Sequence, residues 1–590
     1  MAERLGRAGT LGIYQPHDVI REDRDDGAIV LRARAALGRV AERTTDWLEH
    51  WADVTPDAVF LAERSGAGWR EVTYATARDE ARALALGLQE RGLGPGKPVM
   101  VVTGNSVAHG LLALACQYMG APVVPVAEQY AALPAARGQL DQIAALIQPA
   151  AVFAEVPMPD VTGREALAGA MALSAESLTE LARGGGMLEA SVGPDTVAKI
   201  LMTSGSTSAP KGVLTTHRMM CVNQAQIASA LPFLKERPPV LVDWLPWNHV
   251  FGGSHNFNLV LANGGSLYID GGKPVPALVG KTIENNRLKQ GTISFNVPVG
   301  FAALRDALRE DRGFARAFFE DLDMLFYAGA SLPQEVWADL DAMAREAGTE
   351  PFFTSSWGLT ETAPAALLQH EPTDRSGVVG VPLPGVDVKL LPVDERFEVR
   401  VKGPSIFEGY LGDPEKTAEA FDDEGFFRTG DAMAFVDATD MNQGLRFDGR
   451  IGEDFKLLTG TWVRASALRL QLLDALKGLA QDVVLVGEGR EEVGVLILPT
   501  PPLRDDCHDD GAALRANDPG PILGALNATS GGSATRVRRA LILSLPASIA
   551  EGEITAKGNL NFARIKTLRG DLIARLYDDA DPASITTGGL

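Results

Sequence analysis

The stretch VAKILMTSGSTSAPKG, residues 197–212, carries the strongest structural signal in the chain. Residues 198–202 predict a strand, and the residues after them form a loop of hydroxyls, glycines and one lysine. Backbone N–H groups in such a loop can surround phosphate oxygens, and Lys211 can offset their charge. A P-loop is excluded, because Pro210 precedes the lysine and Gly212 follows it. The stretch therefore predicts either a phosphate-binding loop of another kind or an ordinary surface loop.

Other apolar runs around this stretch alternate with helical patterns. KPVMVVTGNS (97–106) predicts a strand and a turn, SVAHGLLALACQYMG (106–120) a helix, and APVVPV (121–126) the next strand. VLVDWL (240–245) and MLFYAGA (324–330) predict further strands that run into loops. Strands that alternate with helices indicate a parallel, doubly wound sheet, so we expect an α/β fold.

Length and composition limit the possible classes of protein. A chain of 590 residues exceeds what one core supports, which predicts two to four structural units. The net charge of -21 argues against nucleic-acid binding. Cys116, Cys221 and Cys507 form no CxxC pair, which favours reduced thiols. The first residues lack a signal-peptide pattern, and no window reaches the roughly 18 apolar residues of a membrane span. We expect a cytoplasmic protein with no membrane partner.

The organisation of the chain changes near residue 447. After FDGRIGEDFKL come a helical pattern, RASALRLQLLDAL (464–476), and two strand patterns, VVLVG (483–487) and VGVLIL (493–498). Residues 499–534 are rich in Pro, Gly, Asp and Asn and predict a surface excursion. We expect a large N-terminal domain over 1–448 and a small C-terminal domain over 449–590.

The order Thr-Ser-Gly-Ser-Thr…Pro-Lys-Gly resembles the signature loop of the acyl-adenylate-forming superfamily. This superfamily includes acyl- and aryl-CoA synthetases, luciferases and peptide-synthetase adenylation domains. Its further motifs resemble, in the same order, LPWNHVFGG (245–253), YAGASLP (327–333), SSWGLTETAP (355–364), VRVKGPSIFEGYL (399–411), GFFRTGD (425–431), FDGRIGEDFK (447–456) and EGEITAKGNLNFARI (551–565). The resemblance implies doubly wound sheets with a distorted barrel-like part, a small mobile α+β C-terminal domain, and the use of ATP, Mg²⁺ and coenzyme A.

Positions in these motifs imply roles for individual residues. His249 corresponds to the residue that gates the acid pocket, Thr360 to a contact of the α-phosphate, and Glu361 to the Mg²⁺ ligand. Asp431 corresponds to the acceptor of the ribose hydroxyls, a task that suits a carboxylate because both oxygens accept. The implied nucleotide-binding positions are Thr203, Ser204, Gly205, Ser206, Thr207, Lys211, Gly329, Ala330, Ser331, Ser356, Trp357, Gly358, Thr360, Asp431 and Arg450.

The chain departs from the superfamily pattern at two places. Gly452 occupies the position of the usual Asp or Lys hinge, and Glu453 follows it, so both remain candidates for the hinge. In the C-terminal motif the usual spelling is close to Thr-x-x-Gly-Lys, and here aligning the glycines puts Asn559 at the lysine position. Lys557 is the only lysine in the motif, and the catalytic role is carried to it.

A narrower resemblance concerns the acid. PWNHVFGGSHNFNLVL (246–261), NGGSLYIDGGKP (263–274), EDFKLLTGTWV (453–463) and ITAKGNLN (554–561) are similar to bacterial feruloyl-CoA synthetases. The resemblance implies activation of a hydroxycinnamic acid such as ferulate, coumarate or caffeate, by a monomer or homodimer. The alternatives are a CoA ligase for a benzoate-type or medium-chain fatty acid, and an enzyme that loads an acyl carrier protein. A catalytically dead nucleotide-binding regulator would lack Lys211, Glu361 or Lys557, and all three are present.

Overall fold

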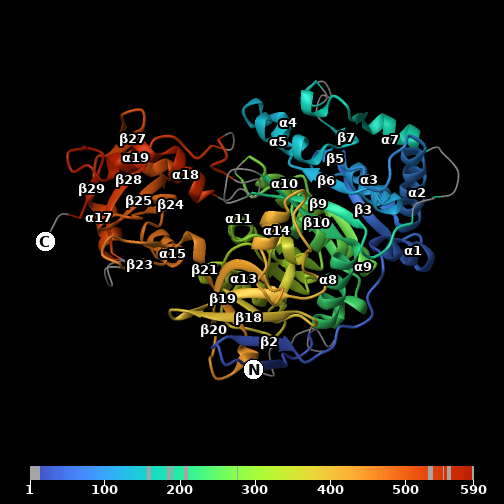
Figure 1. Ribbon diagram of the computed structural model, residues 1–590, viewed down its shortest axis with the longest axis horizontal. Coiled ribbons are helices and arrows are strands. Elements are labelled where there is room, and N and C mark those ends of the chain that lie inside the picture. The colour runs from blue at the N-terminus through green and yellow to red at the C-terminus, as the bar shows by residue number, and fades with distance from the viewer. Residues whose placement is uncertain are drawn as a thin grey trace.

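The computed structural model describes residues 14–155, 161, 163–182, 188, 191–204, 210–275, 277–528, 536–548, 551–554 and 560–587. Figure 1 shows a large part, coloured blue to yellow, and a smaller orange and red part on the left. The large part contains three sheets covered by helices, and the small part contains a fourth large sheet. The expected α/β class, with a large N-terminal and a small C-terminal domain, is confirmed.

The sheet that carries the hydroxyl-rich loop has helices on both faces. Its order is β10-β9-β6-β5-β7-β8. Val99 and Val101 of β5 pack into one apolar cluster, whereas Met100 and Val102 pack into another on the opposite face. This alternation explains why the strand is apolar throughout, and it confirms the doubly wound pattern. Its elements are β5 (Val99–Val102), β6 (Val123–Val126), β7 (Ala151–Ala154), β8 (Met171–Leu173), β9 (Val197–Ser204), β10 (Pro210–Thr216), α2 (Tyr74–Glu90), α3 (Val107–Met119), α4 (Gln129–Ala132), α5 (Arg137–Ile147) and α7 (Ala175–Leu181).

A second, four-stranded sheet lies next to the first and has the order β11-β12-β3-β4. Strands β11, β12 and β3 run parallel, and β4 pairs antiparallel with β3. Leu61 on β3, Leu267 on β12 and Phe257 on α9 belong to the main apolar core. The elements are β3 (Val59–Ser65), β4 (Gly68–Thr73), β11 (Val240–Asp243), β12 (Ser266–Ile269), α1 (Thr44–Val54), α8 (His217–Ala230), α9 (Phe257–Ala262) and α10 (Val279–Leu288).

The third sheet has eleven strands, in the order β1-β2-β18-β19-β20-β21-β17-β16-β15-β14-β13. Strands β13 to β15 are parallel, and the remaining pairs are antiparallel. The described strands of this sheet form an open path and no closed barrel, so the expectation of a distorted barrel-like part is wrong for the described residues; the antiparallel strands continue the sheet instead of closing on themselves. The elements are β1 (Val19–Asp23), β2 (Ile29–Ala33), β13 (Ile293–Asn296), β14 (Met324–Tyr327), β15 (Phe352–Gly358), β16 (Ala365–Leu368), β17 (Val378–Pro382), β18 (Asp387–Val393), β19 (Arg396–Lys402), β20 (Phe427–Phe435), β21 (Leu445–Arg450), α11 (Pro298–Glu310), α12 (Arg312–Glu320), α13 (Gln334–Glu346) and α14 (Pro414–Glu419).

The small part has its own apolar clusters, whose buried members all come from residue 455 onward. The predicted surface excursion is wrong for residues 501–528, which form two helices and two strands. This segment buries Leu514, Ile522 and Leu526 in the cluster. The Pro, Gly and Asp residues around them dominate the composition, which is why the segment was expected to be a surface excursion. The elements are β22 (Phe455–Lys456), β23 (Trp462–Val463), β24 (Ala480–Val486), β25 (Val493–Pro499), β26 (Cys507–Asp509), β27 (Ala513–Ala516), β28 (Val537–Leu543), β29 (Ile585–Thr586), α15 (Ala465–Ala475), α16 (Pro501–Asp505), α17 (Gly520–Ala528), α18 (Phe562–Leu568) and α19 (Gly570–Leu576).

A buried ion pair joins the two parts beside the connecting segment. Arg396 on β19 pairs with Asp454, and each side chain is only 5% exposed. Nη1 of Arg396 also donates a hydrogen bond to the carbonyl of Asp448, at 2.8 Å. Oδ1 of Asp454 accepts a hydrogen bond from the backbone N–H of Ala465, at 3.0 Å, where α15 begins. The pair therefore fixes the start of the small part to a strand of the large one.

We predict that Arg396→Leu destabilises the protein by about 3–5 kcal/mol, because it leaves the buried carboxylate of Asp454 without its cation. Denaturant unfolding at neutral pH measures the loss. Arg464→Leu is the matched control, since Arg464 pairs with Glu395 at 3.4 Å with side chains 36% and 87% exposed. The control should cost less than about 1 kcal/mol. Equal losses in the two variants contradict the role given to the buried pair.

Candidate active site

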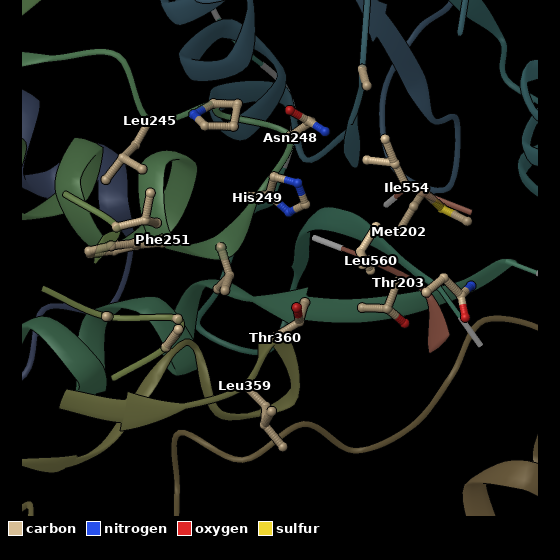
Figure 2. A pocket seen from close by; sticks show the side chains of 18 of the residues that line it. Met202, Thr203, Leu245, Asn248, His249, Phe251, Leu359, Thr360, Ile554 and Leu560 are labelled. Atoms are coloured by element: carbon tan, nitrogen blue, oxygen red, sulfur yellow. The ribbon is translucent and has the colours of Figure 1, made fainter. Parts of the chain in front are cut away.

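A single cleft brings together the residues that the motifs singled out. Its volume is about 2930 Å³, well above the 300–1,000 Å³ of a typical small-molecule pocket, so it has room for more than one ligand. The ends of β9, β14 and β15, the segment after β11, and the strands β20 and β21 all contribute to its lining. Residues of the small part complete it, and Figure 2 shows its interior.

The loop that opened the sequence analysis connects two antiparallel strands. Thr203 near the end of β9 is opposite Lys211 near the start of β10, and both line the cleft. Ser204 continues the strand, whereas Gly205, Ser206 and Thr207 lie outside the described residues. The hairpin holds Lys211 at the mouth of the loop, where a lysine can meet phosphate oxygens.

Tyr410 links Lys211 to Glu361. Nζ of Lys211 lies 4.9 Å from the centre of the Tyr410 ring. The Tyr410 hydroxyl donates a hydrogen bond to Oε1 of Glu361, at 3.0 Å. Burial, and then the Glu361 carboxylate, raise the pKa of Tyr410, so the phenol keeps its proton and remains a donor. Tyr410 was not among the site residues expected from the sequence, although it lies in the motif at 399–411.

Glu361 fits the type of Mg²⁺ site that shares the ion with substrate phosphates. It lies on the short 3₁₀ helix Thr360–Thr362, and its carbonyl accepts a hydrogen bond from Phe407 N–H at 2.8 Å. Among the described residues no three His, Cys, Asp or Glu side chains gather as a metal site. Mg²⁺ commonly needs only one or two protein carboxylates together with phosphates and water. With Oε1 held by Tyr410, Oε2 is the oxygen left for such an ion.

Asp431 is buried between Trp357 and Arg450. Its side chain accepts a hydrogen bond from Nε1 of Trp357, at 2.8 Å, and Nε of Arg450 lies 3.2 Å from Oδ1. Asp431 is opposite Arg450 in the pairing of β20 with β21. Burial raises the pKa of Asp431, and Arg450 and Trp357 act in the opposite direction. The nucleotide-binding role expected of Trp357 did not include this hydrogen bond, which joins strands that are far apart in the sequence.

The remaining residues that the motifs imply for nucleotide binding lie at or after the ends of two parallel strands. Gly329, Ala330 and Ser331 come after β14, and Ser356 and Gly358 end β15; all five line the cleft. A side chain at position 358 would meet the carbonyl oxygen of Pro364 at 1.7 Å, which explains the glycine. Parallel neighbours bring these strand ends to one edge of the sheet, where ligands of α/β proteins bind.

His249 lies on the segment that follows β11, and it lines the cleft (Figure 2). Its carbonyl accepts a hydrogen bond from Gly253 N–H at 2.8 Å, and a π-helix follows over Phe251–Asn256. A Cβ on Gly253 would lie 2.1 Å from the carbonyl oxygen of Trp247. Lys199 is buried beneath this turn and donates a hydrogen bond to the Gly253 carbonyl. Burial lowers the pKa of Lys199 to about 7.

Lys557 and Asn559 lie outside the described residues, but the chain on both sides of them is described. Ile554 and Leu560, the described residues on either side of 555–559, form an antiparallel bridge. Both residues line the cleft, and Figure 2 shows them in the region of Met202 and Thr203. The described residues that flank Lys557 thus lie near the end of β9, although they belong to the small part.

The two hinge candidates lie on the short 3₁₀ helix Ile451–Glu453, directly after β21. A side chain at position 452 would meet nothing within 4 Å, so this conformation does not itself require a glycine. Glu453 accepts a hydrogen bond from the hydroxyl of Ser466 on α15, at 3.1 Å. This hydrogen bond ties Glu453 to the small part, whereas the side-chain position of Gly452 contacts nothing within 4 Å.

Comparison with known proteins extends these observations. Residues 48–411 match the model of the AMP-binding enzyme family, and residues 456–581 match the model of the AMP-binding enzyme C-terminal domain. A feruloyl-CoA synthase from Amycolatopsis is 28% identical over 402 residues, which cover 66% of this chain and 76% of that protein. A long-chain-fatty-acid–CoA ligase from Salmonella typhimurium is 28% identical over 328 residues, covering 52% of each chain.

Solved structures share the fold. The anthranilate CoA ligase AuaEII with anthranoyl-AMP superposes with a TM-score of 0.74 at 18% identity, over 91% of this chain and 99% of that one. ATP-bound MatB from Rhodopseudomonas palustris gives 0.70 at 23% identity, over 90% and 99%. Within the described residues no helix is long and apolar enough to cross a membrane. The chain belongs to the AMP-binding enzyme family, as an adenylate-forming acid–CoA ligase that uses ATP, Mg²⁺ and coenzyme A.

Proposed function

We propose that the chain converts a hydroxycinnamic acid, such as ferulate, coumarate or caffeate, to its CoA thioester. The acid first forms an acyl-AMP with release of pyrophosphate, and coenzyme A then displaces AMP. The observation that carries the proposal is the meeting of Lys211, Tyr410 and Glu361 in one cleft with the Trp357–Asp431 pair. Similarity to a protein named feruloyl-CoA synthase supports the choice of acid.

The aromatic surroundings of the acid pocket also support an aromatic substrate. Phe251 lies on the segment after His249 and lines the cleft. Its ring centre is 6.1 Å from those of the buried Phe295 and Phe326, which support it from behind, and Phe251 is the one of the three that lines the cleft. Flat rings offer large contact area at small entropic cost, and they interact well with another aromatic ring.

Each region has a proposed task. Residues 1–448 bind ATP and the acid, and residues 449–590 carry the hinge and Lys557. Thr203 to Thr207 and Lys211 contact the phosphates, Asp431 and Arg450 the ribose, and Trp357 the adenine. The loop and β-strand residues Gly329, Ala330, Ser331, Ser356 and Gly358 form the surface against which the nucleotide lies.

In the first step a carboxylate oxygen of the acid forms a bond to the α-phosphorus. The bond from that phosphorus to the β-phosphate breaks, and pyrophosphate leaves. Both reactants are anions, so Lys211 and Lys557 are proposed to offset their charge and Thr360 to donate to the α-phosphate. Mg²⁺ neutralises phosphate charge when bound, and Glu361 is the residue proposed to hold it. His249 closes the acid pocket against water.

In the second step the sulfur of coenzyme A attacks the acyl carbonyl carbon. The bond from that carbon to the AMP oxygen breaks, and the thiol proton leaves to solvent. The motion proposed between the steps withdraws Lys557 and turns the small part about Gly452, with Glu453 as the alternative pivot. Glycine permits the largest change in backbone dihedrals at a pivot.

Two other activities are consistent with the same cleft. A ligase for a fatty or benzoate-type acid would share every nucleotide contact, and a fatty-acid ligase is among the relatives. An enzyme that loads an acyl carrier protein would share the first step only. The proposed acid is therefore the part that most needs a direct test.

We predict that ferulate and 4-hydroxycinnamate release pyrophosphate at least tenfold faster than benzoate or octanoate, at equal concentrations below saturation. A pyrophosphate-release assay with ATP and Mg²⁺ measures this, with and without coenzyme A. Liquid chromatography of the products identifies the thioester. An aliphatic acid that matches ferulate would refute the hydroxycinnamate assignment and leave the acid–CoA ligase activity intact.

For Lys557→Ala we predict a loss of roughly two to three orders of magnitude in acyl-AMP formation, the cost of removing one donor that acts on the transition state. Thioester formation from supplied acyl-AMP should change less than about tenfold, because Lys557 withdraws before that step. Single-turnover assays separate the two. Asn559→Ala is the matched control for the alternative register, and a larger loss in that variant would move the catalytic role to position 559.

Trp357→Phe should raise KM for ATP by about 10- to 100-fold, the cost of removing one hydrogen bond to a charged group. The variant keeps an aromatic ring but leaves Oδ2 of Asp431 without its 2.8 Å donor. KM for the acid should stay within about twofold. Steady-state kinetics with each substrate varied in turn gives both values. An unchanged KM for ATP would show that Asp431 does not depend on this hydrogen bond.

A further inference from the structure

The end of the motif at 399–411 has no task in the steps described above, although it contacts both β10 and Glu361. The backbone N–H of Leu411 donates a hydrogen bond to the carbonyl of Gly212 on β10, at 2.8 Å. Four residues earlier, the N–H of Phe407 donates to the carbonyl of Glu361, also at 2.8 Å. This short stretch is therefore fixed at one end to the strand of the hydroxyl-rich loop and at the other to the turn of the proposed Mg²⁺ ligand.

Tyr410 is held firmly within that stretch. Its N–H donates a hydrogen bond to the hydroxyl of Thr417, at 3.0 Å, and its backbone forms an antiparallel bridge with Val213. The ring centre of Phe407 lies 4.9 Å from that of Tyr410, and Nζ of Lys211 lies 4.9 Å from the Tyr410 ring centre. A phenol oxygen lies on the axis about which its ring turns, so rotation of the ring does not move it. The position of the hydroxyl is thus set by contacts of the main chain and of the ring.

From this position the hydroxyl contacts Glu361, which lines the cleft together with Tyr410. It donates a hydrogen bond to Oε1 of Glu361, at 3.0 Å. A phenol is protonated at neutral pH and a carboxylate oxygen can only accept, so the direction of this hydrogen bond is fixed. Glu361 is consequently held through its carbonyl and through one of its two carboxylate oxygens, and Oε2 is the other oxygen.

The number of oxygens that a carboxylate offers matters for the choice of metal ion. Mg²⁺ requires a nearly ideal octahedron with ligands at about 2.0–2.1 Å, and it commonly takes one oxygen from a carboxylate beside phosphates and water. Ca²⁺ accepts about six to eight ligands at about 2.3–2.6 Å, and it often binds both oxygens of one carboxylate. A carboxylate limited to one oxygen therefore suits Mg²⁺ and withholds from Ca²⁺ one of its usual ligands.

We propose that the Tyr410 hydroxyl restricts Glu361 to one metal-binding oxygen, and that it thereby favours nucleotide binding with Mg²⁺ over nucleotide binding with Ca²⁺. The inference rests on the proposed function, in which Glu361 holds the ion that accompanies ATP. Binding of an ion through both oxygens would have to displace the phenol or share Oε1 with it. Binding through Oε2 alone leaves the hydrogen bond intact, so the hydroxyl opposes only the first arrangement.

The test measures nucleotide binding without any reaction. α,β-Methylene-ATP cannot be cleaved between its α- and β-phosphates, and calorimetric titration with saturating Mg²⁺ or Ca²⁺ gives its dissociation constant with each ion. For the wild type we expect the Mg²⁺ complex to bind at least about tenfold more tightly than the Ca²⁺ complex. In Tyr410→Phe, which keeps the ring, this ratio should fall by about tenfold, the lower end of the effect of one hydrogen bond to a charged group.

Tyr268→Phe is the matched control. The Tyr268 hydroxyl donates to Oε1 of Glu71, at 2.8 Å, so this variant loses a hydrogen bond of the same kind. Neither Tyr268 nor Glu71 lines the cleft, and the ratio of the two dissociation constants should equal that of the wild type. Melting temperatures identify a variant that fails to fold. If Tyr410→Phe does so, the wild type decides, because equal affinity for the two complexes overturns the proposal.

Glu361→Gln separates this inference from the proposed function. No acid is present in the titrations, so the result does not depend on which acid the protein activates. If Glu361→Gln binds both complexes as tightly as the wild type does, Glu361 does not hold the ion, and the inference falls with that part of the proposed function. If Glu361→Gln weakens binding of the Mg²⁺ complex but Tyr410→Phe keeps the full preference, the role of Tyr410 alone is overturned. Equal weakening of both complexes in Tyr410→Phe has the same meaning, because the tyrosine then supports the site without choosing the ion.

Discussion

Electrostatic repulsion between the two substrates is the constraint on which the cleft depends, because a carboxylate has to approach a triphosphate. The chain that must bring them together carries a net charge of -21 itself. Its positive groups therefore have to be concentrated where the reaction occurs. Lys211 is held over the ring of Tyr410, whose hydroxyl is turned toward Glu361. Tyr410 thereby contacts both side chains, and one carboxylate oxygen of Glu361 accepts its hydrogen bond.

The fold meets this constraint by bringing rigid strand ends together. β9 and β10 carry Thr203 and Lys211 on paired strands, and β14 and β15 end side by side at the next wall of the cleft. Asp431 and Arg450 are opposite each other on β20 and β21. Groups on such strands lose little freedom when a ligand binds, and this is the advantage of a sheet edge over a mobile loop.

The sequence allowed much of this arrangement to be predicted, but by two different routes. Apolar runs buried on both faces located β5, β6, β9, β11 and β14, because periodicity is a local property. Motif order identified Glu361 and Asp431. Neither route predicts contacts between residues that are far apart in the sequence. The hydrogen bond of Tyr410 to Glu361 spans 49 residues, and that of Trp357 to Asp431 spans 74. Residues 501–528 misled the composition argument, since Pro and Gly there begin helices that cover a core.

The same limit explains why Lys199, Asp243 and His255 passed unnoticed. Each is a polar residue in an apolar segment, and sequence alone does not tell a satisfied buried group from an unsatisfied one. The structure separates them: Lys199 uses its donor on the Gly253 carbonyl, Asp243 accepts twice, and Nε2 of His255 is left over. Burying an ionisable side chain raises the free energy of the folded protein unless the side chain is paired. Lys199 and Asp243 are both paired, and their hydrogen bonds stabilise the turn that carries His249.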